Sequence, residues 1–540
     1  MQSMQFVIRL NAMATPQSSQ TLWRANLTVA CGTALSRATG LIRIIVFGAM
    51  IGQTALADVY DAANNAPNVV YELLVGGILA ATLVPLFTRH LQADDDEAVS
   101  AISSVAFVAL TVITALAIVL SPLIFRMFSL NPADDVDVEM FRNTGTVLTR
   151  LFLVQIFFYG ITAIASAILN SKRRFFAAAW TPVMANVVTI LTLLAIPAVT
   201  SLKPPPLSEA ASNNSLQWLL GLGSTSGIIV MAVGMAIALS RSGVRLHWNL
   251  NFTHPAVVNL IRLSGWAAGY VAANQVALVV IKNLARPGSG NVDAYSKAYA
   301  FFSLPHGLLA VSLATTFAPD LARAVANLDI PDFQNRLISG IRLTALFTIP
   351  ASFGMFVLAR PLVAMLLQHG SFTSLATQNT ARALSGLAIG LAGFSVYLFV
   401  LRGFYANNDT RTPFWLNLFE NGLNIIFAIV LVKRFDILGL GIAFATAYLV
   451  SAVVAMFVMQ IKSPGFKATA TLAGLIPFFV SALVMAVCVF LFKNLFNSNE
   501  SAAGLDATLQ VFGGLLGGSV IYCVMLFIFR VNEVRTLVHR

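Results

Sequence analysis

Long apolar runs, separated by short polar stretches, repeat along the whole chain. Each run is long enough for a helix that crosses a bilayer, which takes about 20 residues. None shows the alternation of polar and apolar residues that is typical of a membrane β-strand. The pattern predicts an all-α polytopic membrane protein with about fourteen transmembrane helices. The predicted spans are 27–51, 60–88, 99–124, 145–170, 176–200, 216–240, 256–283, 292–318, 337–360, 378–403, 413–433, 438–461, 470–493 and 507–530.

The composition excludes other classes of protein. Of the 540 residues, 58% are hydrophobic and 10% are charged, whereas soluble domains carry roughly 25% charged residues. A disordered chain would show the opposite balance. Cys31, Cys488 and Cys523 lie inside apolar runs, which is typical of small hydrophobic residues. The net charge of +11 comes from basic residues scattered between the runs, so nucleic-acid binding is not favoured.

The same basic residues predict how the chain is oriented. Fourteen spans place both termini on one side of the membrane. If that side is the cytoplasm, the inner segments carry 17 Lys and Arg residues and the outer loops carry 9. Because Lys and Arg are enriched in short cytoplasmic loops, we expect both termini in the cytoplasm. Residues 1–26 would then form a cytoplasmic tail without a cleavable signal peptide.

Two short motifs recur at nearly the same offset along the chain. Residues 79–85, near the end of the second predicted span, resemble residues 313–319, which lie 234 positions later (319 − 85). Residues 181–186 resemble residues 412–417, which lie 231 positions later (412 − 181). Six spans separate the copies, so the matches predict a parallel repeat about an axis along the membrane normal.

The repeat predicts how the chain is divided. Helices 1–6 would form an N-terminal lobe (27–250) and helices 7–12 a C-terminal lobe (251–461). Helices 13 and 14, with a C-terminal tail, would occupy 462–540 outside the repeat. Transporters of this design bind substrate between the lobes and alternate access by rocking them. The sequence therefore predicts a transporter.

Two arginines lie well inside the first predicted span. Arg37 and Arg43 are six positions apart, which is about 120° around a helix, so both can face one wide cavity. Charge inside a membrane usually faces a cavity or a partner, and a guanidinium pairs well with phosphate oxygens. We predict that both arginines bind a phosphate-bearing substrate. Alternatively, Arg43 extends to the membrane interface or pairs with an acid.

Three further polar residues are substrate-binding candidates. Asp58, at the start of the second span, is either a partner of the arginines or a helix cap. Asn68 follows Pro67, and its amide either satisfies a bent backbone or contacts a ligand. Lys297, early in the eighth span, is either a phosphate contact from the second lobe or a residue that extends to the interface.

Glu420 and Asn424 lie one turn apart in the eleventh span, so they share a helix face. They are candidates for a cation site, and the alternative is an ion pair between Glu420 and Lys297. No resident metal or cofactor is expected, because the two closest histidines, His247 and His254, have no further metal-binding residue nearby. No arrangement of residues typical of an enzyme is present.

Five segments carry a resemblance to a known family. They are Ser36–Arg43, Pro67-Asn68 with Gly77 and Val84-Pro85, Leu304-Pro305 with Gly307, Gly370–Thr373, and Phe404–Pro413. In these segments the chain resembles the MurJ (MviN) family, the lipid II flippases of the multidrug/oligosaccharidyl-lipid/polysaccharide exporter superfamily. The resemblance extends from about residue 27 to residue 461.

The resemblance implies a function. Such a protein would move the undecaprenyl-pyrophosphate-linked peptidoglycan precursor (lipid II) from the inner to the outer leaflet of the bacterial cytoplasmic membrane, by alternating access of a central cationic cavity. The family's cavity arginines would correspond to Arg37 and Arg43, and its aspartate after the first span to Asp58. Partners would be the lipid-linked precursor, membrane lipids and proteins of cell-wall synthesis or division.

The chain also departs from the family pattern. Ile44 stands where an acid often follows the second arginine, and Ala300 stands where the family has an arginine in the eighth span. Tyr71-Glu72 replaces a basic pair, and Gly76-Gly77 replaces Glu-Gly. The cavity is therefore expected to be less cationic than in typical members. A polysaccharide-unit flippase or a cation-coupled exporter is the alternative function, whereas a scaffold would have no reason to keep costly arginines in the membrane.

The last two predicted spans have no counterpart in the repeat. In the resembling family they border a groove for the long lipid tail, and we expect the same here. Phe512 and Leu515 are three positions apart and share one face of the last helix, so they are predicted to line this groove. The alternative is a packing or partner surface.

Overall fold

The computed structural model describes residues 19–72, 80–93, 95–258, 265–495, 504–531 and 533. All regular structure in these ranges is helical. Of the predicted 1–26 tail, residues 1–18 lie outside the described residues, and the rest is already part of the first helix. Gly76 and Gly77, and Leu79 of the repeat motif, also lie outside the described ranges.

The helices of the first half are α2 (Ser19–Ile51), α3 (Ala55–Tyr71), α4 (Ala80–Gln92), α5 (Asp96–Val119), α6 (Ser121–Met127), α7 (Val138–Leu153), α8 (Gln155–Ser171), α9 (Phe176–Leu194), α10 (Leu207–Ser212) and α11 (Asn214–Ser240). A short 3₁₀ turn, η2 (Ile196–Ala198), follows α9.

The helices of the second half are α13 (Gly265–Leu284), α14 (Asn291–Pro305), α15 (Val311–Ala326), α16 (Ile330–Leu367), α17 (Ser374–Ile389), α18 (Leu391–Ala406), α19 (Arg411–Phe435), α20 (Ile437–Lys462), α21 (Ala468–Ala473), α22 (Ile476–Leu495) and α23 (Leu505–Ile528). One turn of π-helix, η3 (His306–Ala310), joins α14 to α15.

Eleven of the described helical segments are long and apolar enough to cross a membrane, and the α17–α18 pair, bent by 46°, makes up to twelve. Two predicted spans remain. One coincides with α3 and α4, which flank the undescribed residues 73–79, and the other with α13, which follows the undescribed residues 259–264. The described helices are therefore compatible with the fourteen predicted spans, and the expectation of an all-α membrane protein is confirmed.

Short polar side chains fix where many of these helices begin. Thr54, Asp95, Asp137, Asp329 and Thr373 each accept a hydrogen bond from the backbone N–H three positions later. Such caps satisfy N–H groups that the first helical turn leaves without a partner.

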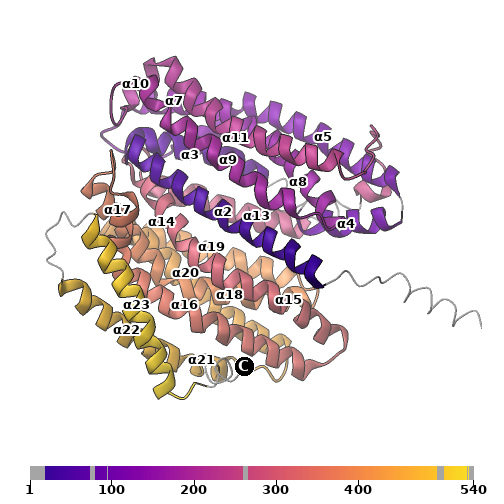
Figure 1. The fold of residues 1–540 in the computed structure, drawn as a ribbon, viewed down its shortest axis with the longest axis vertical. Coiled ribbons are helices and arrows are strands. Elements are labelled where there is room, and N and C mark those ends of the chain that lie inside the picture. The colour runs from indigo at the N-terminus through magenta and orange to yellow at the C-terminus, as the bar shows by residue number, and fades with distance from the viewer. Residues whose placement is uncertain are drawn as a thin grey trace, which may run out of the picture.

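The buried apolar side chains form two large clusters, one in each half of the molecule. The first extends from Phe47 to Val257 and the second from Ile281 to Val531. Figure 1 shows the same arrangement, with the indigo and magenta helices in one lobe, the pink to yellow helices in the other, and α2 along the boundary. Accordingly, α2 packs against α9 and also contacts α16 of the other lobe.

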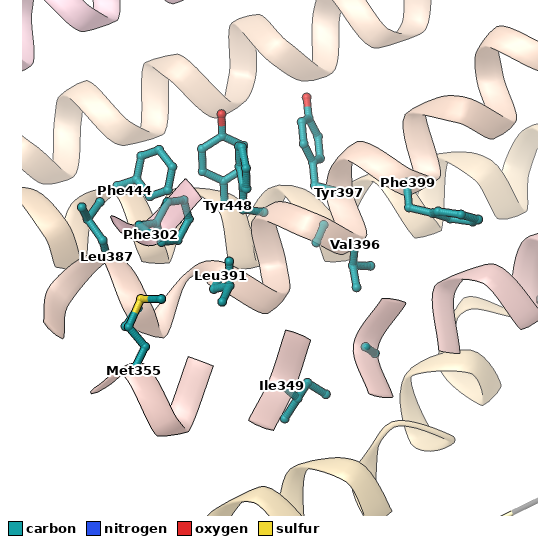
Figure 2. Close-up of a cluster of buried hydrophobic side chains, with 14 of the residues drawn as sticks. Phe302, Ile349, Met355, Leu387, Leu391, Val396, Tyr397, Phe399, Phe444 and Tyr448 are labelled. Carbon is teal, nitrogen blue, oxygen red and sulfur yellow. The ribbon is translucent and has the colours of Figure 1, made fainter. Parts of the chain in front are cut away.

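The core of the second lobe is rich in aromatic rings. Phe302, Phe394, Phe444 and Tyr448 pack together with ring centroids 4.6–5.8 Å apart. Figure 2 shows that the hydroxyl groups of Tyr397 and Tyr448 point away from the apolar side chains, toward the same side. The rings thus fill the core while the polar ends lie at its edge.

The C-terminal pair of helices is attached to the second lobe. Helices α22 and α23 pack against each other and against α16, and in Figure 1 they lie at the outer edge of that lobe. The Tyr522 hydroxyl donates to the Leu346 carbonyl at 2.8 Å. An ion pair between Arg342 and Glu533 joins α16 to the segment after α23.

Candidate functional site

A polar cavity of about 320 Å³ lies where the two lobes meet. Its walls come from α2, α3, α8, α9 and α11 of the first lobe and from α14 of the second. The charged residues of the lining are Arg43, Asp61, Asp293 and Lys297. Its other polar residues are Tyr60, Asn64, Asn65, Asn68, Gln155, Tyr159, Thr189, Ser224 and Ser296. The cavity is therefore polar on the side of both lobes.

The second-lobe cation of the cavity is held by an acid on its own helix. The Lys297 ammonium donates to the Asp293 carboxylate one turn earlier, and both side chains are about 5% exposed. The ammonium also lies 4.8 Å from the Phe47 ring centroid and 5.6 Å from that of Phe372, where a cation–π contact stabilises it. The alternative ion pair of Lys297 with Glu420 is therefore wrong.

A second ion pair crosses between the lobes beside the cavity. Lys282 of α13 donates to Asp61 of α3, and the lysine is only 3% exposed. With Asp293 and Asp61 both engaged, Arg43 is the lining cation for which the described part of the chain offers no ion-pair partner. Its guanidinium is free to meet an anion.

Arg37 lies at a different level of α2. The six positions between the two arginines correspond to about 9 Å along the helix axis, and Arg37 is not part of the cavity lining. Its guanidinium packs against Gly307 in the π-turn of the second lobe, where a side-chain carbon would come within 2.3 Å of Nη1. A glycine at 307 thus makes room for Arg37 at the junction of the lobes.

Asp58 is fully buried and connects the lobes at the start of α14. Its carboxylate accepts hydrogen bonds from the backbone N–H groups of Gly288, Gly290 and Asp293, at 2.9, 2.8 and 2.9 Å. Gly288 and Gly290 have φ of +100° and +83°, a conformation that glycine adopts readily. Asp58 therefore caps a helix of the opposite lobe, whereas the N-cap of its own helix is Thr54.

Further contacts between the lobes lie near the same place. The Asn283 amide contacts the backbone of Met127 and Leu130 at 2.7 and 2.6 Å, and the Ser371 N–H donates to the Ala49 carbonyl at 2.9 Å. These hydrogen bonds between the lobes all lie near the end where α2 stops and α3 and α14 begin. The lobes are tied together at this end.

Asn68 lines the cavity while its amide is engaged. Its Nδ2 donates to the Asn64 carbonyl at 3.2 Å, and Asn65 bonds back to Asp61 in the same way. These bonds surround Pro67, which lies inside α3. Asn68 thus lines the cavity with an amide whose Nδ2 is already bonded within α3.

Glu420 and Asn424 lie in a separate buried cluster of the second lobe, 1% and 6% exposed. The Tyr448 hydroxyl lies beside the Glu420 carboxylate, but no hydrogen bond of normal geometry from the described residues reaches either oxygen of Glu420 or the amide oxygen of Asn424. The amide oxygen of Asn417, on the same face of α19, is also without a partner, although Asn417 Nδ2 donates to Asn274 of α13 at 2.9 Å. One face of α19 thus presents buried oxygen atoms to a common region.

Phe512 and Leu515 lie on the exposed face of α23, 55% and 52% exposed. The opposite face, with Gly514 and Gly518, packs against Leu358 and Val489. An apolar cavity of about 510 Å³ borders α16, α18, α20 and α22, but Phe512 and Leu515 do not line it. Their role in holding a lipid tail stays a prediction.

The site includes residues that the sequence interpretation missed. One of them is Asp293, which lies four positions before Lys297. This is the spacing of a helical ion pair, and it is the sequence signal that could have identified Asp293. Lys282, at the end of the predicted span 256–283, was not among the candidates, yet it pairs with Asp61. Since their positions in the chain are 221 apart, no local signal points to that pair.

A two-lobed membrane bundle with a polar cavity at the lobe junction has the architecture of a transporter. The solved structures with the same fold include an inward-facing multidrug-resistance MATE transporter of the MOP superfamily, with a TM-score of 0.65 at 13% identity over 81% of this chain and 95% of that one. A structure of lipid II flippase MurJ in an inward closed conformation matches with a TM-score of 0.76 at 21% identity, covering 94% of this chain and all of that one.

The sequence comparisons identify the family. The family model described as lipid II flippase MurJ matches residues 47–503. Among relatives, the lipid II flippase MurJ of Burkholderia cenocepacia is 29% identical over 398 residues, which is 73% of this chain and 75% of that protein. The probable lipid II flippase MurJ of Rhizobium meliloti is 26% identical over 506 residues, 93% of this chain and 92% of that one. This chain belongs to the MurJ family, a family of transporters rather than enzymes.

Proposed function

We propose that this protein is a flippase that moves lipid II from the inner to the outer leaflet of the bacterial cytoplasmic membrane. The observation that carries the proposal is Arg43, a lining cation of the lobe-junction cavity that forms no ion pair with the described residues. A pyrophosphate is prohibitively expensive to move through hydrocarbon unless fixed cations meet its charge. Membership of the MurJ family supports lipid II as the substrate.

Each candidate residue has a distinct role in this proposal. Arg43 binds the pyrophosphate, because its planar guanidinium forms paired hydrogen bonds with phosphate oxygens. Arg37 lies six positions before Arg43 on α2, against Gly307, and contacts the pyrophosphate before it reaches Arg43. Lys297 assists more weakly, because Asp293 already neutralises it. Asn68 contributes a neutral contact.

Alternating access follows from where the lobes are tied. The contacts of Asp58 and Asp61 with the second lobe hold one end of the cavity closed. With both termini in the cytoplasm, as we propose from the cation count, the tied end is the outer one and this structure faces inward. A cysteine at Ser208 should then react with a membrane-impermeant thiol reagent from outside, and one at Ser171 should not. The reverse labelling would contradict the orientation.

The test of substrate binding uses four substitutions of cationic residues. Losing a hydrogen bond to a charged group costs about 1.5–3 kcal/mol, which is roughly 10- to 100-fold in affinity. We expect Arg43→Ala to abolish complementation of a MurJ-depleted strain, Arg43→Lys to impair it, Arg37→Ala to resemble Arg43→Ala, and Lys297→Ala to be milder. Arg150→Ala, outside the cavity lining, is the matched control. Full growth of Arg37→Ala and Arg43→Ala at normal membrane levels would refute the roles of both arginines.

We further propose that Glu420 and Asn424 bind a coupling cation. A group of three or more His, Cys, Asp or Glu side chains is not found in the described part of the chain, so a cation here would be held by one carboxylate together with amide oxygens. Hard cations prefer such oxygen ligands, and these buried oxygens receive no hydrogen bond of normal geometry from the described residues.

We propose that the tail of the lipid remains outside the polar cavity, because a polyprenyl chain is too apolar to enter it. The tail would contact the exposed face of α23, which carries Phe512 and Leu515, while the headgroup crosses the membrane. Proteins of cell-wall synthesis that use the precursor on the outer side, and proteins of cell division, are the partners that this role suggests.

A further inference from the structure

A second amphipathic pocket, of about 790 Å³, lies in the first lobe between α2, α8, α9 and α11. None of its lining residues belongs to the lobe-junction cavity. The apolar part of its lining includes Leu169, Phe176, Trp180, Met184 and Ile237. Phe176, Met184 and Ile237 are 61%, 48% and 46% exposed, so the described residues do not cover this apolar wall of the pocket.

Three arginines form the polar end of the same pocket. Arg173 and Arg174 follow α8 directly, and Arg241 follows α11. All three are exposed, and none forms an ion pair with the described residues. The lining contains no acidic side chain. Three positive charges thus lie together at the mouth of an apolar pocket without a counter-charge.

The backbone holds two of these arginines in place. Arg174 Nη1 donates to the Arg241 carbonyl at 2.9 Å, which joins the end of α8 to the end of α11. Arg173 occupies a turn with φ of +58°. The arginines are therefore brought to one place by the ends of two helices, rather than scattered over a loop.

Trp180 connects the pocket to α2, the helix that carries Arg43. Its indole N–H donates to the Thr28 carbonyl at 3.2 Å, and its ring packs on Gly32, where a side-chain carbon would come within 2.8 Å. Phe176 stacks on the same ring at 5.7 Å. Tryptophan is typical of the membrane interface, which places the arginine end of the pocket at headgroup depth.

We propose that this pocket binds an anionic phospholipid of the cytoplasmic leaflet. The phosphodiester contacts Arg173, Arg174 and Arg241, and one acyl chain occupies the apolar wall between α9 and α11. Basic pockets between transmembrane helices on the cytoplasmic side bind anionic headgroups, and the proposed orientation puts residues 171–175 and 241–255 on that side. A ligand with one charged end and one apolar chain matches both parts of the lining.

The experiment measures lipid binding to the full-length protein by native mass spectrometry, with phosphatidylglycerol and phosphatidylethanolamine as the probes. We expect phosphatidylglycerol to bind at least tenfold more tightly. The triple variant Arg173→Gln, Arg174→Gln, Arg241→Gln should lose that preference, at roughly fivefold per neutralised charge. A triple variant of three exposed arginines elsewhere, Arg89→Gln, Arg323→Gln and Arg411→Gln, is the charge-matched control and should bind as the parent does.

A second pair of variants tests the apolar wall and keeps the arginines intact. Ile237→Trp fills the pocket and should reduce phosphatidylglycerol binding at least tenfold. Val233→Trp, one turn earlier on α11, exposed and outside the lining, should not. Each variant is checked for an unchanged melting temperature.

Three results would overturn the proposal. They are equal binding of the two lipids, parent-like binding by the arginine triple, and parent-like binding by Ile237→Trp. A lipid-linked pyrophosphate that displaces phosphatidylglycerol, and loses its own binding in the arginine triple, would also overturn it by assigning the pocket to the substrate. Binding is measured without transport, so failure of this proposal and failure of the proposed function are distinguishable.

Discussion

Asp58→Ala should release the end at which the two lobes are tied together. The substitution removes three hydrogen bonds, from Gly288, Gly290 and Asp293, each 2.8–2.9 Å long. A hydrogen bond to a charged group contributes about 1.5–3 kcal/mol net. Opening the interface returns all of these groups to water and the three bonds share one carboxylate, so we take about 3 kcal/mol for the set. That energy changes the ratio of protein open at this end to protein closed at this end by roughly 100-fold.

The fraction of protein in which the lobes have separated is measured by pulsed electron paramagnetic resonance. This method gives the distance between two spin labels, placed on predicted outer loops of opposite lobes. Labels at Ser208→Cys and Lys433→Cys, both exposed, report the separation in lipid nanodiscs. The three native cysteines are replaced by alanine for this purpose. We expect the parent to give one short distance and Asp58→Ala to add a longer component.

A matched control separates opening from general destabilisation. Asp137 caps α7 within the first lobe through the Met140 N–H at 3.0 Å, so Asp137→Ala removes a cap without touching the other lobe. The Asp137→Ala variant should give the same single short distance between the two spin labels as the parent. An unchanged distance distribution in Asp58→Ala, with protein of normal stability, would refute the idea that this carboxylate ties the lobes together.

Three other predictions concern different parts of the molecule. Replacing Phe512 or Leu515 with Asp should reduce lipid II flipping several-fold in proteoliposomes while leaving folding intact, because an apolar tail does not pack against a charged side chain. Unchanged flipping in both variants would refute the idea that this face of α23 lines a groove for the tail. Glu420→Gln should abolish any stimulation of flipping by sodium or by a pH gradient, and stimulation that persists would exclude this carboxylate. Burial raises the pKa of Asp409, but hydrogen bonds from Lys462 and Thr412 outweigh it and lower the pKa below the usual value of 3.8. The stabilisation from Asp409 is therefore present above about pH 4 and lost as the pH falls through the lowered pKa, so the melting-temperature loss of Asp409→Asn should shrink in acid; a loss that is constant with pH would contradict this.

The local sequence pattern was sufficient to predict where the helices lie, but not which parts of the chain they contact. Apolar runs locate the spans because a bilayer demands about 20 apolar residues whatever the rest of the chain does. The long uninterrupted runs at 176–200 and 438–461 accordingly coincide with described helices. The bend between α17 and α18 at Gly390 was not predicted, since glycines at 386, 390 and 393 do not by themselves say where a helix bends, and the close approach of Gly390 to Ala445 is a contact between distant parts of the chain.

The candidate site shows the same limit. Arg43 could be placed near a cavity because an intramembrane charge needs a polar surrounding. The destination of Asp58 could not, since a carboxylate at a helix start is satisfied by its own helix as readily as by another, and its donors lie 230 or more positions away. For α23, helical spacing put Phe512 and Leu515 on one face, but which face is exposed depends on how α16 packs against the helix.

The two acids of the cavity change how the membrane voltage acts on a transport cycle. Lys297 is paired with Asp293 and Lys282 with Asp61, so the empty cavity reorients with the single unpaired charge of Arg43 in its described lining. A potential of 100 mV does work of about 2.3 kcal/mol on each elementary charge that crosses the membrane. A loaded cavity carries the negative charge of the pyrophosphate outward, the direction that an inside-negative potential favours. The two acids thereby limit the charge that moves on the empty return to that of one cation.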